Sequence, residues 1–236
     1  MNDESPRRTE GISVFLDESG THHGAEVVLA GAVVTPHAAL MEAQVVAAAH
    51  DAIADPALWP TFEKMTAFER SGFHYSADQP STRDQFLLAM RRMDYRAHVA
   101  FSRHASGVEG VELLVNMYYT LVRNILLRYR TEVIVFAFEE ESRMNSLYSR
   151  IVGAARDDVA NTLGLRVDAT AVRANKRAPI LGVVDYVLAV AGHALATQPK
   201  AYEVGRFNRG LPAHLAHLID FDRAVHRSSR KGIELL

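Results

Sequence analysis

The sequence predicts an α/β fold in which a five-stranded mixed sheet carries helices on both faces. Three observations lead to this prediction. Apolar β-type runs alternate with helical runs along most of the 236 residues. Only a short polar loop separates the first two β-type runs, which favours an antiparallel hairpin. A long helix precedes the fourth β-type run, so this run can lie parallel to the first.

β-branched and aromatic residues indicate the strands, and apolar residues at three- and four-residue spacing indicate the helices. The predicted strands cover residues 12–16, 26–36, 95–103, 131–138 and 165–174. The predicted helices cover residues 37–55, a segment that begins at Ser81, and residues 108–129, 145–163, 179–195 and 211–227.

The segment 37–93 is predicted to be a mainly helical insertion between the second and third strands. Its first helix is rich in alanine, whereas residues 55–80 contain three prolines and predict an irregular stretch. Ser81 with Asp84 resembles a capping box and predicts the start of the next helix. We expect the whole chain, 1–236, to form a single domain.

The composition of the chain limits the classes of function that the protein can have. The polar residues 1–10 are expected to be disordered, and no apolar run reaches the ~18 residues that span a bilayer, so we expect a soluble cytoplasmic protein without a membrane partner. Cysteine is absent, which excludes disulfides and thiolate metal sites. The formal net charge of -2 provides no global basic field, so nucleic-acid binding would need local basic patches or bound metal.

Carboxylates stand where packing alone would place apolar side chains. Asp17 and Glu18 end the first strand, and Glu139 and Glu140 follow the fourth. Asp185 lies within the apolar helical run ILGVVDYVLAV, where a carboxylate is costly unless it is paired, protonated or bound to a cation. Because the carboxyl ends of parallel strands meet at one edge of a sheet, these acids are expected to share a crevice.

Such a cluster suits Mg²⁺ or Mn²⁺, which prefer oxygen ligands. Two ions ~3.5 to 4 Å apart can activate water and stabilise the leaving oxygen in phosphodiester cleavage. Each acid also has a purely structural explanation. Asp17 and Glu18 could form a turn, the acids after the fourth strand could lie in a solvated loop, and Asp185 could hydrogen-bond to a neighbour.

Four segments resemble the domain of unknown function 3800 family, and the resemblance extends over roughly residues 11 to 200. They are FLDESG, LAGAVV, FHYSADQPSTRDQF and PILGVVDYVLAV. The resemblance implies a ribonuclease H-like fold and a metal-dependent nuclease-type active site. It matches Asp17 to the family's first-strand aspartate and Asp185 to the aspartate of its late helix.

The same resemblance places the fourth-strand acid at Glu139 or Glu140, where glutamate replaces the usual aspartate. Asn175 and Lys176 stand where many members have a Ser-Lys pair, which implies that Lys176 approaches the scissile phosphate. Glu18 and His74 would support the site. His74 has two interpretations, since a loop histidine can orient a phosphate or shuttle a proton, or can simply pack between its aromatic neighbours.

Two functions follow as hypotheses. The first is a divalent-metal-dependent nuclease that hydrolyses RNA or DNA. The second is a non-catalytic ribonuclease H-like interaction module that binds a protein partner or nucleic acid, because a fold alone does not define a function.

Overall fold

The structure, a computed structural model, describes residues 11–22, 24–130, 132–164, 166–196 and 214–228. The disorder expected for residues 1–10 lies outside this part of the chain. Six strands form one mixed sheet in the order β5-β4-β1-β2-β3-β6. The strands are β1 (Ile12–Ser19), β2 (Val28–Thr35), β3 (Arg96–Ser102), β4 (Val133–Glu139), β5 (Asp168–Ala174) and β6 (Leu215–Asp220).

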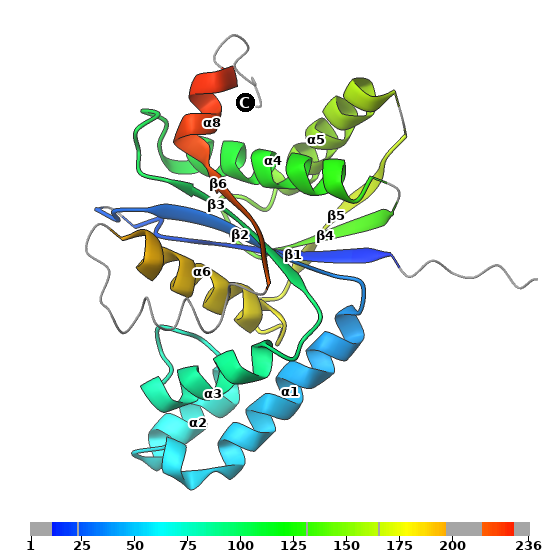
Figure 1. Cartoon of the computed structure of the whole chain (residues 1–236). Coiled ribbons are helices and arrows are strands. Elements are labelled where there is room, and N and C mark those ends of the chain that lie inside the picture. The colour runs from blue at the N-terminus through cyan, green and yellow to red at the C-terminus, as the bar shows by residue number, and fades with distance from the viewer. Residues whose placement is uncertain (1–10, 23, 131, 165, 197–213, 229–236) are drawn as a thin grey trace, which may run out of the picture.

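Helices flank this sheet on both faces. They are α1 (Ala38–Ala54), α2 (Phe62–Ser71), α3 (Pro80–Met90), α4 (Gly110–Arg128), α5 (Tyr148–Leu163), α6 (Leu181–Leu195) and α8 (Phe221–Ser228), with a short 3-10 helix η1 (Pro56–Leu58). Figure 1 shows α4 and α5 on one face of the sheet and α6 on the other, with α1, α2 and α3 forming a helical layer beyond α6. No helix in the described part of the chain is both long enough and apolar enough to cross a membrane.

The two pairings expected for the first strand are confirmed. β1 pairs antiparallel with β2 and parallel with β4, so it lies between them. The short loop after β1 explains the first pairing, and the helix before β4 allows the chain to return for the second. The carboxyl ends of β1 and β4 therefore lie side by side.

The prediction of five strands is wrong, because residues 215–220 form a sixth strand rather than part of a helix over 211–227. β6 pairs parallel with β3, and the helix α8 begins only at Phe221. Leu215 and Ile219 lie four residues apart, a spacing that fits one face of a helix and equally one face of a strand. The unpaired hydrogen-bonding groups along β3 decide between them.

The helical layer also differs from its prediction. Residues 55–80 are not wholly irregular, since they contain α2. Thr61 caps this helix by accepting a hydrogen bond from the Lys64 backbone N–H at 3.3 Å, and Gly72, with φ of 69°, ends it. The next helix begins at Pro80 with Gln79 as its N-cap residue, so the predicted Ser81 capping box does not start it.

Two apolar clusters lie on opposite faces of the sheet, and alternation along β1 assigns its side chains to them. Val14 and Leu16 pack in the cluster with α4 and α5, whereas Phe15 packs against the cluster that includes α6. By the same alternation Asp17 faces α6 and Glu18 faces α4. Gly31 on β2 lets α6 approach closely, because a Cβ there would lie 2.7 Å from Leu188.

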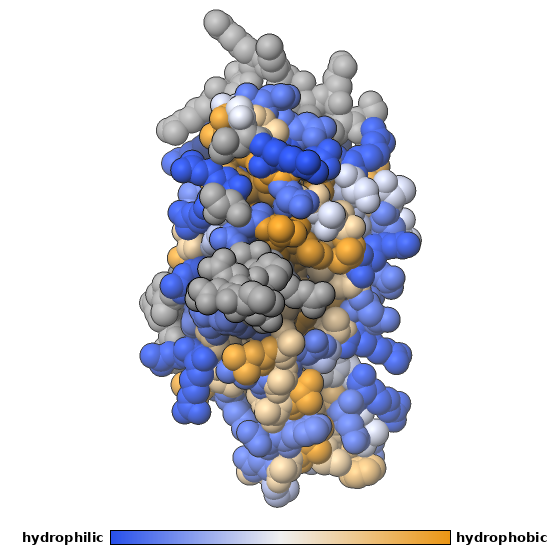
Figure 2. Space-filling view, turned by 90° about the vertical axis from the view of Figure 1, so that its right-hand side faces the viewer, coloured by the Kyte–Doolittle hydropathy of each residue, from blue (hydrophilic) through white to orange (hydrophobic). Residues whose placement is uncertain are grey.

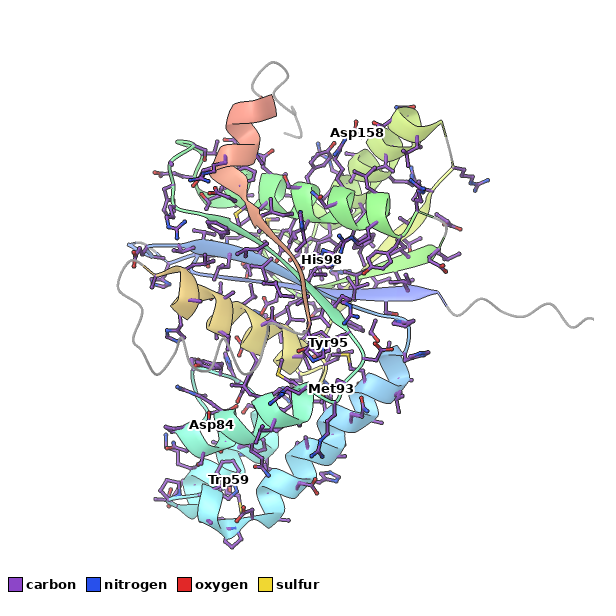
Figure 3. All side chains as sticks on the ribbon, in the orientation of Figure 1. Trp59, Asp84, Met93, Tyr95, His98 and Asp158 are labelled. Atoms are coloured by element: carbon purple, nitrogen blue, oxygen red, sulfur yellow. The ribbon has the colours of Figure 1, made fainter. Side chains whose placement is uncertain are left out.

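His98 on β3 is a buried polar group away from the carboxyl ends of β1 and β4. The residue is 1% exposed, and neither ring nitrogen has a hydrogen-bond partner in the described part of the chain. Burial lowers its pKa to about 4, so the imidazole is neutral at ordinary pH. Figure 3 shows His98 inside the molecule, between the sheet and α4.

The surface carries some apolar side chains. Figure 2 shows a face on which apolar patches lie between hydrophilic side chains. The exposed large apolar residues of the helical layer are Leu40, Val46, Phe62 and Leu88. Val46 lies beside a cleft that is described below.

Candidate functional site

The strand ends bring two acids together. Leu16 of β1 is paired with Phe138 of β4, and the next residue on each strand is an acid, Asp17 and Glu139. Both acids project to the face opposite Leu16 and Phe138, which is the face that α6 covers. The parallel register thus places one carboxylate from each strand at the same edge of the sheet.

Helix α6 supplies a third acid from across the cleft. Two groups of the loop before α3 hold Asp185: the Tyr75 backbone N–H donates to its Oδ2 at 2.7 Å, and His74 Nδ1 lies 2.8 Å from the same oxygen. This hydrogen bond to Asp185 raises the pKa of His74 and favours the charged imidazolium. The loop and the helix are thereby linked at the acid that sequence reasoning singled out.

A cleft of about 1340 Å³ connects these groups. Six of the seven residues predicted for the site line it: Asp17, Glu18, His74, Glu139, Lys176 and Asp185. Glu140 does not line the cleft. Its side chain is exposed and its backbone N–H donates to the Ala174 carbonyl at 3.1 Å, which continues the pairing of β4 with β5. Of the two glutamates left open by the sequence, Glu139 is therefore the one beside Asp17.

The acids perturb one another. Burial, followed by repulsion from Glu139 and Glu18, raises the pKa of Asp17 from 3.8 to about 8, and Asp185 adds to the rise. Glu18 points to the other face, where the Tyr118 hydroxyl of α4 donates a hydrogen bond to it. Burial raises the pKa of Glu18, although the Tyr118 hydrogen bond opposes this rise.

Lys176 stands at the rim between the acids and solvent. Its Nζ lies 3.6 Å from Glu139 Oε1 and 4.0 Å from Glu141 Oε2. Arg143 also binds Glu141, with Nε 2.9 Å from Oε1, and this hydrogen bond lowers the pKa of Glu141. The cleft is therefore acidic at its floor and basic at its rim.

Sequence reasoning missed a buried acid that supports the loop. Asp78 is 7% exposed and accepts hydrogen bonds from the His74 backbone N–H, at 3.0 Å, and from the Tyr186 hydroxyl. Burial raises the pKa of Asp78 to about 6. Its signal in the sequence is its position in the box FHYSADQP, four residues after His74. Tyr186 adjoins Asp185 on α6, so Asp78 fixes the loop against the helix beside the candidate site.

Replacing Tyr186 by Phe should destabilise the protein by roughly 1 to 3 kcal/mol, because the buried Asp78 carboxylate would lose a donor. Urea denaturation of Tyr186→Phe near neutral pH measures this loss. Tyr129→Phe is the matched control, since the Tyr129 hydroxyl has no hydrogen-bond partner in the part of the chain that the structure describes. Equal stability of both variants would contradict a supporting role for the Asp78 contact.

The donor chemistry of the cleft suits a hard divalent cation, because carboxylate oxygens dominate its floor. As the side chains lie, however, no group of three or more His, Asp or Glu residues within the described ranges could hold a metal ion. Lys176 pairs with Glu139, and His74 pairs with Asp185. Metal binding at Glu139 would therefore require Lys176 to give up this carboxylate, whereas His74 contacts only one of the two Asp185 oxygens, Oδ2.

Comparisons with known proteins give little beyond this geometry. No family model matches the chain, and no curated protein is similar to it. One solved structure with a similar arrangement is that of the PCNA:RNase HII complex from Archaeoglobus fulgidus, with 12% sequence identity, a TM-score of 0.43, and coverage of 94% of this chain and 91% of that chain. This likeness is distant, and the function proposed below is argued from the cleft itself.

Proposed function

We propose that the protein is a divalent-metal-dependent nuclease-type enzyme with a ribonuclease H-like core, and that it hydrolyses phosphodiesters of RNA or DNA. The observation that carries this proposal is the meeting of Asp17, Glu139 and Asp185, from two parallel strands and a facing helix, in one open cleft. A structural acid needs one good partner, whereas burial and the neighbouring acids raise the pKa of Asp17 to about 8. A perturbed carboxylate in a cleft is typical of a functional site.

Each residue has a role under this proposal. Asp17, Glu139 and Asp185 hold Mg²⁺ or Mn²⁺, and Glu18 supports the strand end by donating its backbone N–H to Asp17 Oδ1 at 2.7 Å. His74 orients Asp185 through Nδ1. When bound, such a cation supplies Lewis-acid activation of water and of the phosphate.

Lys176 is well placed to meet the substrate. It lies at the rim of the cleft and its side chain is exposed, so its ammonium can leave Glu139 for a phosphate oxygen of an entering strand. The metal would then replace the positive charge that Lys176 places beside Glu139, and the phosphate would become the partner of Lys176. The resemblance of the sequence to the domain of unknown function 3800 family supports the same assignment of Asp17, Asp185 and Lys176.

A metal titration tests the proposal without knowledge of the substrate. Mg²⁺ or Mn²⁺ at millimolar concentration should raise the Tm, because a ligand that binds only the native state stabilises it by mass action. The increase should shrink strongly in Asp185→Asn. Asp51→Asn is the control, since Asp51 lies exposed on α1 away from the cleft. A wild-type Tm that does not respond to either metal would count against the metal site.

One observation favours the alternative, a non-catalytic module that binds a protein or nucleic acid. The described acids do not form a ready metal-ligand group as they lie. Such a module would bind its partner equally well with metal or with chelator and would cleave no nucleic acid. A cleavage assay with a mixed panel of RNA and DNA, with Mn²⁺ and with chelator, separates the two functions.

A further inference from the structure

A second cleft, of about 450 Å³, adjoins the carboxylate cleft. One wall is the apolar face of α1, with Val46, Ala49 and Ile53, and the other is the end of α2 together with the start of α6. Figure 1 shows α1 and α2 together in the layer beyond α6. A volume within the ~300 to 1,000 Å³ of small-ligand clefts suits a planar ring and its sugar.

The two clefts are continuous. They share six lining residues: Arg70, Ser71, Phe73, Lys176, Arg177 and Gly182. A single extended ligand can therefore occupy both. Any strand that places a phosphate at Asp17 and Lys176 has its next unit close to the second cleft.

The charges of these shared lining residues indicate which kind of ligand would extend from one cleft into the other. Arg70, Lys176 and Arg177 all line it, against a single acid of the second cleft, Glu69. Lys176 pairs with Glu139 of the first cleft, whereas Arg70 and Arg177 form no ion pair with other residues of the described ranges. Guanidinium groups that have no acidic partner among the described residues favour a ligand with negative charge at that point, as a phosphodiester backbone has.

The polarity of the second cleft differs from that of the first. Its inner walls are aliphatic. Val46 of α1 is 37% exposed in this cleft, whereas Met41 and Val45 of the same helix are buried. A nucleobase has apolar faces that such walls can cover, and an anionic backbone that the guanidinium groups can bind. An apolar peptide side chain would fit the walls but would leave Arg70 and Arg177 without partners.

We propose that this second cleft binds one unstacked base of a single-stranded nucleic acid whose neighbouring phosphate lies in the carboxylate cleft. The inference rests on the proposed function for its ligand class and goes beyond it by specifying the strand. A base held inside a duplex cannot reach the aliphatic walls, because its faces are covered by stacking and its edge by pairing. The second cleft therefore selects single strands, or unpaired positions, over duplex.

Binding can be tested separately from cleavage. The protein is prepared as Asp17→Asn and kept in chelator, so that nothing is cut and one repelling acid is removed. Fluorescence anisotropy then measures the affinity for a labelled oligonucleotide of about 12 nucleotides, for a fully abasic strand of the same length and charge, and for the duplex. The intact single strand should bind roughly tenfold or more tightly than either of the others.

Ala49→Phe fills the second cleft, and Ala47→Phe is its matched control on the exposed side of the same helix. Ala49→Phe should weaken binding of the intact strand about tenfold and leave the abasic strand unchanged, because only the base is excluded. Ala47→Phe should change neither affinity. If Ala49→Phe lowers the Tm markedly, Ala54→Phe at the mouth of the cleft replaces it.

The outcomes separate the two proposals. Equal affinity for intact and abasic strands, equal effects of Ala49→Phe and Ala47→Phe, or no binding of any strand would each overturn the base-binding cleft. A base-dependent affinity in a protein that cleaves nothing with Mn²⁺ would instead overturn the nuclease and leave the cleft standing. Mn²⁺-dependent cleavage could instead be the same for single strands and duplexes and unaffected by Ala49→Phe. That result would overturn the base-binding cleft and leave the nuclease standing.

Discussion

Asp17→Asn should abolish Mn²⁺-dependent cleavage of nucleic acid, with a fall in rate of at least ~1,000-fold, equivalent to about 4 kcal/mol of transition-state stabilisation. Asp17 is the central acid of the cluster, since burial and then repulsion from Glu139, Glu18 and Asp185 raise its pKa. An amide in its place keeps the shape and hydrogen bonding of the side chain but cannot carry the negative charge that a divalent cation needs.

Single-turnover cleavage of a labelled RNA and DNA panel measures this effect, with Asp51→Asn as the matched control. Asp51 is exposed on α1 and should retain wild-type cleavage. The folded state of each variant is checked by its Tm. If Asp17→Asn keeps a tenth or more of wild-type activity while wild type is active, then Asp17 is not a metal ligand and the proposed site is wrong.

The second large effect concerns the metal-free protein, which should lose stability as the pH rises from about 4 to about 8. The pKa of the Asp17 carboxyl is raised from 3.8 to about 8. Between these values the native state holds a proton that the unfolded chain has released, so the free energy of unfolding falls as the pH rises. Below the unfolded pKa both states are protonated and no penalty exists. Above about pH 8 the penalty is complete, at most on the order of 6 kcal/mol.

Asp17→Asn should remove most of this slope and make the metal-free protein at about pH 8 more stable than wild type. Chemical denaturation in chelator at about pH 5 and about pH 8 compares wild type, Asp17→Asn and Asp51→Asn, of which the last should keep the wild-type slope. A turn-forming acid would behave oppositely, because its amide replacement typically costs ~1 kcal/mol. Lower stability of Asp17→Asn at both pH values would favour the structural explanation.

The sequence predicted the part of the fold that local pattern determines. The hairpin of β1 and β2 follows from a short loop, and α4, the helix that precedes β4, lets β4 run parallel to β1. β6 was missed because the spacing of Leu215 and Ile219 fits a helix as well as a strand, and only the open edge of β3 distinguishes them.

The candidate site was predictable to the level of residue type and strand end. Which glutamate of β4 accompanies Asp17 depends on register, and a shift of one residue moves a side chain to the other face of the sheet. Asp78 has a signal in its own segment, its place in the box FHYSADQP, whereas Tyr118 could not be found from its own segment. Tyr118 looks like an ordinary apolar position of α4, and its contact with Glu18 joins residues that are distant in the sequence.

The central place of β1 in the sheet has a consequence for the order of folding. β1 can pair with β2 as soon as both have been synthesised, but its other edge must wait for β4, and the cleft must wait for α6, which follows later still. Contacts between distant segments form late, because closing a long loop of chain costs entropy before any contact compensates for it. Asp17 therefore meets Glu139 and Asp185 in the last docking steps, and their repulsion should slow those steps at neutral pH. Divalent cations or mild acid in the refolding buffer should therefore accelerate the final phase of folding while leaving the early hairpin unaffected.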